Sequence, residues 1–514
     1  MKKYTYLVLA ALIGLSLLSG CGDDDPNPPA NIITSLQLIE NPNGVAPLTA
    51  RLLVSTNTPA KVSIKVFGQN GDASDIVHDF PEVSNSFDIP VLGLYPDSEN
   101  QVQVTFSDQS GAILTTTSFT VLTDPLIAEM PQIEVNTLIT GTTVPGLNFV
   151  NYFGHNGNVL PQRAFMFDQF GDIRWYLDFS SHPTLSTLFF DNGMNFLQNG
   201  NLVFGDGTTD KLYEINMLGE VLNEWEMPGY GFHHHVIEKP NGNFLVTVND
   251  NSKTTVEDVV IEIGRTSGNI VNVWDLNESL DNSRRTWDTD LADLDIDWFH
   301  ANAVEYSPDD DAIIVSGRTQ GTVKLSNDNE VIWILAPHKG WATAGNGSDL
   351  NQFLLQPLDA QGNTIDDQQI VEGETNHPGF EWAWYQHSPV LMPNGNIMIF
   401  DNGDNRNYIS PGNYSRAVEY EIDEQNMTIK QIASYGKERG QETYSRIVSK
   451  VTYHESQNNV IFTPGAITDG SSFSGKIVEV DWQNQQVVFE ATISPPEPLF
   501  IITFHNVLRA NLYR

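Results

Sequence analysis

Apolar and polar residues alternate along most of this chain, which is the period of β-strands rather than of helices. Residues 31–122 contain long alternating runs, among them LTARLLVSTNTPAKVSIKVFG and QVQVTFSD, with turn residues between them. These runs predict a small N-terminal β-sandwich, and residues 123–146 are expected to form a linker. We therefore expect an all-β protein.

The remaining residues, 147–514, repeat one hairpin pattern. An alternating run, a turn rich in Asn, Gly, Pro or Asp and a second β-rich run recur as FLQNGNLVFGDG, VIEKPNGNFLVTVND, VEYSPDDDAIIVSG, VLMPNGNIMIFDNG and VTYHESQNNVIFTPG. Each is followed by a second hairpin with an aromatic-rich strand, such as GEVLNEWEM or NEVIWIL. Two hairpins supply the four strands of a propeller blade. With an initial unit around residues 163–177, the pattern predicts a six-bladed β-propeller over residues 147–514, and stacked sandwiches are the rival architecture.

The first residues carry an export signal. A positively charged start and an apolar stretch over residues 6–18 end in the sequence LSGC at Cys21, which resembles a bacterial lipoprotein signal (residues 1–21) with a lipidated cysteine. Residues 22–30 then form a polar, Pro-rich tether. No later apolar run reaches the ~18 residues that a membrane span needs. We expect an exported protein, attached only by its lipid to the periplasmic face or the surface of the outer membrane.

Composition narrows the class of partner. The 514 residues include 26 Lys and Arg against 65 Asp and Glu, a net charge of −39. A nucleic-acid partner is therefore not expected, because a phosphate backbone requires a basic face. Cys21 is the only cysteine, so no disulfide is expected within the mature chain.

One predicted hairpin, WFHANAVEYSPDDDAIIVSGRT, carries three residues suited to a tetrahedral oxyanion. Arg318 offers a charged fork of donors, and His300 and Asn302 add donors of shorter reach. The alternative is a hairpin whose polar residues merely face water. However, His234, Asn302 and His387 each lie six residues before a turn proline, and therefore occupy the same position on three blades. Innermost propeller strands line the central channel, so we expect these side chains to converge there.

A metal site is the competing interpretation, because histidine clusters bind zinc or copper. His233, His234 and His235 are adjacent, and neighbouring side chains on a strand point to opposite faces, so they are not expected to share one ion. Arg318 would also repel a cation. We expect no metal here.

The segments GFHHHVIEKPNGN, WFHANAVEYSPDDDAIIVSGRTQ, NEVIWILAPHKGW and WAWYQHSPVLMPNGNIMIFDNGDNR resemble the bacterial arylsulfate sulfotransferase family. The resemblance implies transfer of a sulfuryl group from a phenolic sulfate ester to a phenol, without the nucleotide donor PAPS or another cofactor, by a ping-pong mechanism through a sulfurylated histidine. His387 matches the nucleophile, and His300, Asn302 and Arg318 match residues that hold the sulfate. A further sulfate-binding histidine matches His234, or else His233.

At three points this chain departs from the family pattern or cannot be matched to it residue by residue. The family usually has an acidic residue where this chain has His235. A hydroxyl ligand found in some members is expected at Ser449 or Thr452. A disulfide known in some members is absent here.

The implied chemistry agrees with the residue types. Neutral imidazole is a competent nucleophile, and Arg318 with His300 can stabilise charge on the transferred group. His234 or His300 can exchange a proton with the phenol. Aromatic residues near the motifs can stack on a phenolic ring or simply pack the blades: Trp298, Phe299, Trp382, Trp384 and Tyr385.

Two other functions remain open at this stage. Exported propellers also serve as ligand receptors, and the same site with water as the acceptor would make a sulfate hydrolase. The set of His387, His300 and Arg318 favours the enzyme over a receptor. The sequence leaves the oligomeric state open, with a homodimer as one option.

Overall fold

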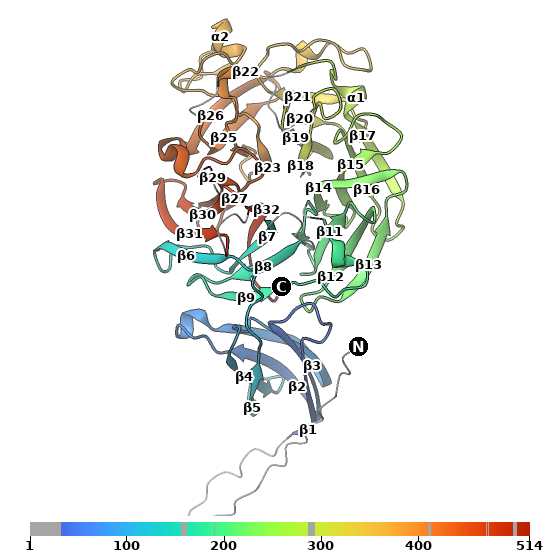
Figure 1. The fold of residues 1–514 in the computed structure, drawn as a ribbon, viewed down its shortest axis with the longest axis vertical. Coiled ribbons are helices and arrows are strands. Elements are labelled where there is room, and N and C mark those ends of the chain that lie inside the picture. The colour runs from blue at the N-terminus through green and yellow to red at the C-terminus, as the bar shows by residue number, and fades with distance from the viewer. Residues whose placement is uncertain are drawn as a thin grey trace, which may run out of the picture.

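The computed structural model describes residues 32–155, 162–189, 191–285, 293–409, 413–468, 470, 472–496 and 501–514 (Figure 1). Strands dominate it, as the alternation predicted. The helices are single turns: α1 (Leu276–Ser279), α2 (Gln368–Val371), η1 (Asp72–Ser74), η2 (Leu185–Thr187), η3 (Leu350–Phe353), η4 (Arg406–Tyr408) and η5 (Lys437–Glu442). None of the described helices is long and apolar enough to span a bilayer. The predicted signal, Cys21 and the tether lie outside the described residues.

The N-terminal domain is built around one long strand. Its five antiparallel strands are β1 (Ile33–Glu40), β2 (Thr49–Val66), β3 (Ile76–Leu92), β4 (Glu99–Ser107) and β5 (Ile113–Leu122). The first half of β2 pairs with β1 and its second half with β4, while β3 pairs along both halves. Alternate residues of β2, such as Leu52, Val62 and Ile64, are buried, which is the pattern that predicted the strand.

The strands after residue 146 hydrogen-bond in groups of four. The first two groups are β7 (Leu147–His155), β8 (Arg163–Phe167) and β9 (Ile173–Tyr176) with the C-terminal β32 (Ile501–Ala510), and then β10 (Asn195–Phe196), β11 (Leu202–Asp206), β12 (Lys211–Ile215) and β13 (Val221–Glu226). The third and fourth groups are β14 (Tyr230–Glu238), β15 (Phe244–Asp250), β16 (Val259–Ile263) and β17 (Ile270–Asp275), and then β18 (Ala301–Ser307), β19 (Ala312–Gly317), β20 (Gly321–Leu325) and β21 (Val331–Leu335). The last two groups are β23 (His387–Leu391), β24 (Ile397–Asp401), β25 (Arg416–Asp423) and β26 (Thr428–Tyr435), and then β27 (Lys450–His454), β28 (Asn459–Thr463), β30 (Phe473–Asp481) and β31 (Gln486–Ser494). The five predicted hairpins are confirmed, because each predicted turn joins the first two strands of a group.

Three short strands extend these groups. β22 (Gln356–Leu358) runs parallel to β26, β29 (Ile467–Thr468) pairs with β30, and β6 (Gln132–Leu138) pairs with the outer strand β31. β6 lies within the expected linker, so part of that segment is a strand at the edge of the last group.

The first strands of the groups face a common centre. β14 contacts β18, β18 contacts β23, β23 contacts β27 and β27 contacts β32, and Figure 1 shows the groups arranged around this centre with the N-terminal domain to one side, next to β9. β32 pairs with β7 and so brings the C-terminal strand into the first group.

Tryptophans in the fourth strands tie one group to the next. The indole N–H of Trp175 donates to Met217 O at 2.8 Å, that of Trp274 to Ser326 O at 2.8 Å, and that of Trp333 to a carboxylate oxygen of Glu424 at 2.8 Å. Each acceptor belongs to the following group. The aromatic-rich strands of the repeat therefore form the contacts between neighbouring sheets.

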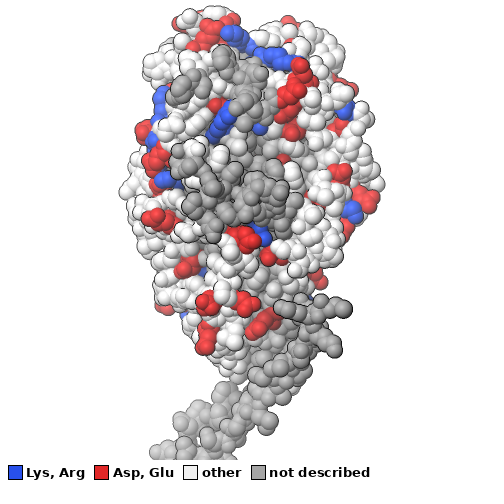
Figure 2. Space-filling view, viewed as in Figure 1, with Lys and Arg blue, Asp and Glu red and all other residues white. Residues whose placement is uncertain are grey.

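The visible surface is mainly uncharged and acidic, with isolated basic side chains (Figure 2). This agrees with the excess of Asp and Glu in the sequence.

Candidate functional site

The polar residues predicted to share one blade position lie where the first strands are irregular. The pairing of β14 with β15 is interrupted around His234, that of β18 with β19 at Asn302, and that of β23 with β24 just after His387. The β32–β7 pairing is interrupted in the same way at His505. A β-bulge re-aims the side chain it contains. As a result, His234, Asn302, His387 and His505 line one central cavity.

One expectation about this region was wrong. His233 and His234 do not point to opposite faces, because their rings lie 3.9 Å apart at an angle of 89°. The bulge and the left-handed backbone of His234, with φ of 58°, break the alternation of the strand. His235 also lines the central cavity, and its Nδ1 accepts a hydrogen bond from the Val304 amide at 3.2 Å.

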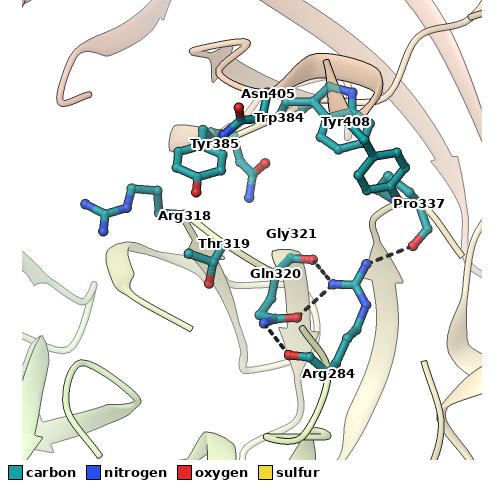
Figure 3. Close-up of a pocket in the computed structure, with 12 residues that line it drawn as sticks. Arg284, Arg318, Thr319, Gln320, Gly321, Pro337, Trp384, Tyr385, Asn405 and Tyr408 are labelled. Atoms are coloured by element: carbon teal, nitrogen blue, oxygen red, sulfur yellow. Dashed lines mark hydrogen bonds between the residues drawn. The ribbon is translucent and has the colours of Figure 1, made fainter. Parts of the chain in front are cut away.

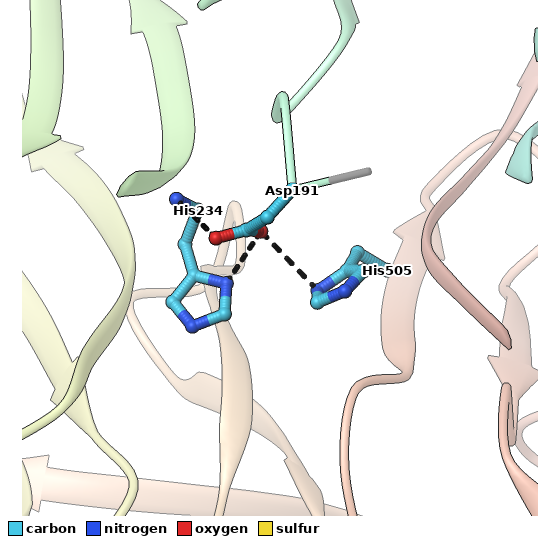
Figure 4. A group of neighbouring side chains, drawn as sticks. All are labelled: Asp191, His234 and His505. Carbon is cyan, nitrogen blue, oxygen red and sulfur yellow. Dashed lines mark hydrogen bonds and ion pairs between the residues drawn. The ribbon is translucent and has the colours of Figure 1, made fainter. Parts of the chain in front are cut away.

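Carboxylates lie behind the histidine rings. His234 Nδ1 lies 2.7 Å from an Asp191 oxygen, and His505 Nδ1 lies 3.7 Å from the same oxygen (Figure 4). His300 Nδ1 lies 2.8 Å from Asp297 and also contacts Glu257. At the two shorter distances the carboxylates accept the Nδ1 protons of His234 and His300, which leaves the Nε2 atoms of these two rings facing each other.

The Nε2 atoms of His234 and His300 are 3.0 Å apart. A hydrogen bond between them requires a proton on one ring, which makes that ring an imidazolium. Burial lowers the pKa of His234 well below its usual value, even though Asp191 opposes this. The pair therefore holds one proton between its two Nε2 atoms.

A second imidazolium lies beside this pair. His233 Nε2 is 2.7 Å from Glu257 and 3.5 Å from Asp191. Burial lowers the pKa of His233, but the two carboxylates outweigh it and raise the pKa to about 9. His233 is therefore charged at neutral pH, together with the fixed charge of Arg318.

His387 has the opposite character. Its Nδ1 lies 2.7 Å from the Asn402 side-chain oxygen and 3.2 Å from Tyr385 O. The Asn402 amide cannot be reversed, because its nitrogen donates to Ser445 O at 2.8 Å and Val448 O at 3.0 Å. The proton of His387 is therefore on Nδ1, and burial lowers the pKa of the ring to about 3. Nε2 carries a free lone pair and has no hydrogen-bond partner among the described residues.

Arg318 and Asn302 complete the predicted oxyanion set. Arg318 Nη2 is 3.4 Å from Asp297, while its buried Nε has no partner in the described part of the chain. The Asn302 nitrogen donates to Gln386 O at 2.9 Å. Asn302 therefore also holds the backbone that leads into His387, which the sequence did not indicate.

The structure separates the remaining candidates. Ser449 lines the same cavity as His387, whereas the hydroxyl of Thr452 lies 3.3 Å from His454 Nε2. Trp298, Phe299 and Trp382 belong to the cores of the sheets. Trp384 and Tyr385 instead line a second pocket, next to Arg318 (Figure 3).

Sequence reasoning missed five residues of the site. They are three carboxylates, one amide and one histidine: Asp191, Glu257, Asp297, Asn402 and His505. One signal was available, because the tripeptide Asp-Asn-Gly occurs both at residues 191–193 and at residues 401–403. Asp297 lies only three residues before His300, whereas Glu257 and His505 lie far from the motif residues in sequence and meet them only in space.

The same side chains also meet the distance requirement of a metal site. Three overlapping sets have ligand atoms within 4.8 Å of one another among the described residues: Asp191, His234 and His505; His233, His234 and Glu257; Glu257, Asp297 and His300. A metal there would displace the protons that these ring nitrogens share with the carboxylates. The largely buried cations His233 and Arg318 favour an anion at the centre of the site.

Two family descriptions match the chain. That of the arylsulfotransferase (ASST) family matches residues 133–497, and that of the arylsulfotransferase Ig-like domain matches residues 37–124. The chain belongs to the arylsulfotransferase family. The predicted enzyme class, an aryl-sulfate sulfotransferase, is thereby confirmed, as is an N-terminal β domain.

Curated relatives agree over nearly the full length. An arylsulfate sulfotransferase AssT of Escherichia coli O6:H1 is 28% identical, and the match covers 96% of this chain and 97% of that protein. One from Lelliottia amnigena is also 28% identical, over 90% of each chain. Among solved structures, a streptogramin B lyase is 10% identical and covers 72% of this chain and 100% of its own, with a TM-score of 0.31.

Proposed function

We propose that this member of the family moves a sulfuryl group from a phenolic sulfate ester to a phenol in two steps, without PAPS, through a covalent intermediate on His387. The observation that supports this most directly is the state of His387. Its Nδ1–H is held by Asn402, and its Nε2 has a free lone pair at the cavity. A buried neutral imidazole with a fixed orientation is a prepared nucleophile.

In the first step, His387 Nε2 attacks the sulfur of the donor. A nitrogen–sulfur bond forms, the bond between sulfur and the phenolic oxygen breaks, and the electron pair leaves with that oxygen. The proton shared by His300 and His234 is placed to neutralise the departing phenolate. Arg318 and Asn302 are the donors for the sulfuryl oxygens.

In the second step, the acceptor phenol returns the proton to the His300–His234 pair, and its oxygen attacks sulfur. The nitrogen–sulfur bond breaks and restores neutral His387. Because both steps use one site with its proton donor and acceptor exchanged, the mechanism is ping-pong.

We further propose the architecture and location that go with this reaction. The six groups of strands form a closed six-bladed propeller over residues 147–514, since β32 and β7 join the two ends of that region. The protein is exported and held to a membrane by lipid on Cys21. Expression of wild type and of Cys21→Ser, followed by separation of membrane and soluble fractions, tests this. Equal membrane association of both would refute lipid anchoring.

The test of the reaction is intact mass spectrometry of the protein without its first 21 residues after brief mixing with p-nitrophenyl sulfate. We expect a mass gain of one sulfuryl group, which phenol removes and His387→Ala abolishes. Release of nitrophenol that continues without any phenol would favour a hydrolase. A folded protein that neither gains mass nor releases nitrophenol would refute the transferase and favour a receptor.

A further inference from the structure

A second pocket adjoins the site and shares Arg318 with the chemistry above. It extends from Arg318 to Arg284 and is walled by the aromatic rings of Trp384, Tyr385 and Tyr408 (Figure 3). The enclosed space in it is about 30 Å³, and the space is about 390 Å³ when the open mouth is included. The Trp384 and Tyr408 rings meet edge to face, 5.0 Å apart at 87°. Gln386, the residue before His387 in the chain, also lines this pocket.

Three buried donors at this pocket have no hydrogen-bond partner within the described part of the chain. They are Trp384 Nε1, Asn405 Nδ2 and Arg318 Nε. Their residues are 8%, 4% and 8% exposed. Leaving a buried donor unpaired costs about 1–3 kcal/mol. Arg318 is assigned to the sulfuryl oxygens above, so the two donors of Trp384 and Asn405 indicate a ligand that brings further acceptor atoms.

Arg284 adds a buried positive charge at the far end. Its donors bond only to neutral oxygens: Lys339 O at 3.0 Å, Gln320 Oε1 at 2.7 Å and Pro337 O at 3.3 Å, besides Gln320 O at 3.2 Å. Four bonds leave one of the five guanidinium N–H groups unused. No carboxylate of the described residues lies within ion-pair distance of it. A buried cation without a counter-ion favours an anionic ligand.

We propose that this pocket binds the aromatic ring of a phenolic substrate that carries a carboxylate on the ring, away from the reacting oxygen. The proposal rests on the sulfuryl transfer proposed above and names its substrate class. The ring stacks between the aromatic walls, its phenolic oxygen lies toward Arg318 and His387, and the carboxylate accepts from the Trp384, Asn405 and Arg284 donors.

Acceptor competition tests the proposal. With p-nitrophenyl sulfate as donor, kcat/KM is measured for phenol, 4-hydroxybenzoate, its methyl ester and tyramine. Hydrogen bonds to a charged group change binding by about 10- to 150-fold, so we expect 4-hydroxybenzoate to exceed phenol by about tenfold or more, and tyramine to be the poorest. A ratio of 4-hydroxybenzoate to phenol near one would overturn the proposal. Equal values for 4-hydroxybenzoate and its ester would overturn the assignment of charge.

Two matched variants locate the effect. Trp384→Phe keeps an aromatic ring and removes the indole donor, so the ratio of 4-hydroxybenzoate to phenol should fall several-fold. Trp274→Phe removes an equally buried indole N–H, which bonds Ser326 O outside this pocket, and should leave the ratio unchanged. The same change in both variants would contradict the pocket assignment.

Calorimetric titration with 4-hydroxybenzoate separates this proposal from the reaction itself. If no phenol is sulfurylated, the proposed function fails, yet binding that Trp384→Phe weakens and Trp274→Phe does not would still support the pocket. Transfer without a preference among the phenols, and without measurable binding, would overturn the pocket alone.

Discussion

The charge on His233 depends on Glu257, which makes Glu257→Gln an informative perturbation. Glu257 lies 2.7 Å from His233 Nε2, and the pKa of His233 is raised to about 9. Removing one adjacent opposite charge lowers a pKa by about 1–3 units, which places His233 at about 6–8 in the variant. Since the imidazolium persists only below its pKa, its fraction at pH 8 falls from about 90% to between about 1% and 50%.

Activity should follow that fraction if the imidazolium helps to hold the sulfate. We expect the alkaline decline of kcat/KM for p-nitrophenyl sulfate to begin about 1–3 pH units lower in Glu257→Gln than in the wild type. At pH 8 the loss is then about 2- to 90-fold, and at pH 5 it is small. The assay is initial nitrophenol release in the presence of phenol, from pH 5 to 10.

Glu262→Gln is the matched control. Glu262 is buried on β16 in the same sheet and pairs with Lys239 at 2.9 Å instead of with a histidine. Replacing Glu262 lowers the stability of the fold, but the alkaline decline of kcat/KM should begin at the same pH as in the wild type. If kcat/KM of Glu257→Gln declined at the same pH as in the wild type, or if both variants shifted equally, the His233–Glu257 pair would not support sulfate binding.

Three further perturbations address the rest of the site. Arg318→Met should lower kcat/KM by about 10²–10³, and Arg318→Lys by less, because lysine keeps the charge and loses the planar fork; a fully active Lys variant would contradict the role given to that fork. Asn402→Ala should slow sulfurylation in a single turnover by about tenfold or more with little effect on KM, since Asn402 acts through the orientation of His387, and an unchanged rate would remove that role. Dialysis against EDTA should leave both half-reactions unchanged; loss of activity that zinc restores would mean that one of the His–carboxylate sets holds a metal.

The local pattern was sufficient for most of the fold. Period-two alternation and Asn-Gly turns depend only on residues close in sequence, and they located the hairpins such as β14–β15 and β23–β24. Short strands without this alternation were not predicted. β6 and β22 pair with strands far away in the chain, and no local signal distinguishes them from loops.

Part of the candidate site could likewise be predicted from the sequence, and part of it could not. Equal spacing from the turn prolines placed His234, Asn302 and His387 at equivalent positions, and a common position on adjacent first strands brings residues together in any such repeat. The bulge at His234 could not be anticipated, because it depends on pairing with β15, and it turned His233 toward the site as well.

By itself, the sequence determined the all-β class, the repeat and the residues of its innermost strands, since all three follow from short-range periodicity. Only the tertiary structure decided which atoms carry protons. Glu257 and Asp191, from separate loops, keep His233 charged, while burial keeps His387 neutral and Asn402 fixes its proton on Nδ1. Charge states follow from burial and from partners across space, and those are properties of the folded chain rather than of any segment of it.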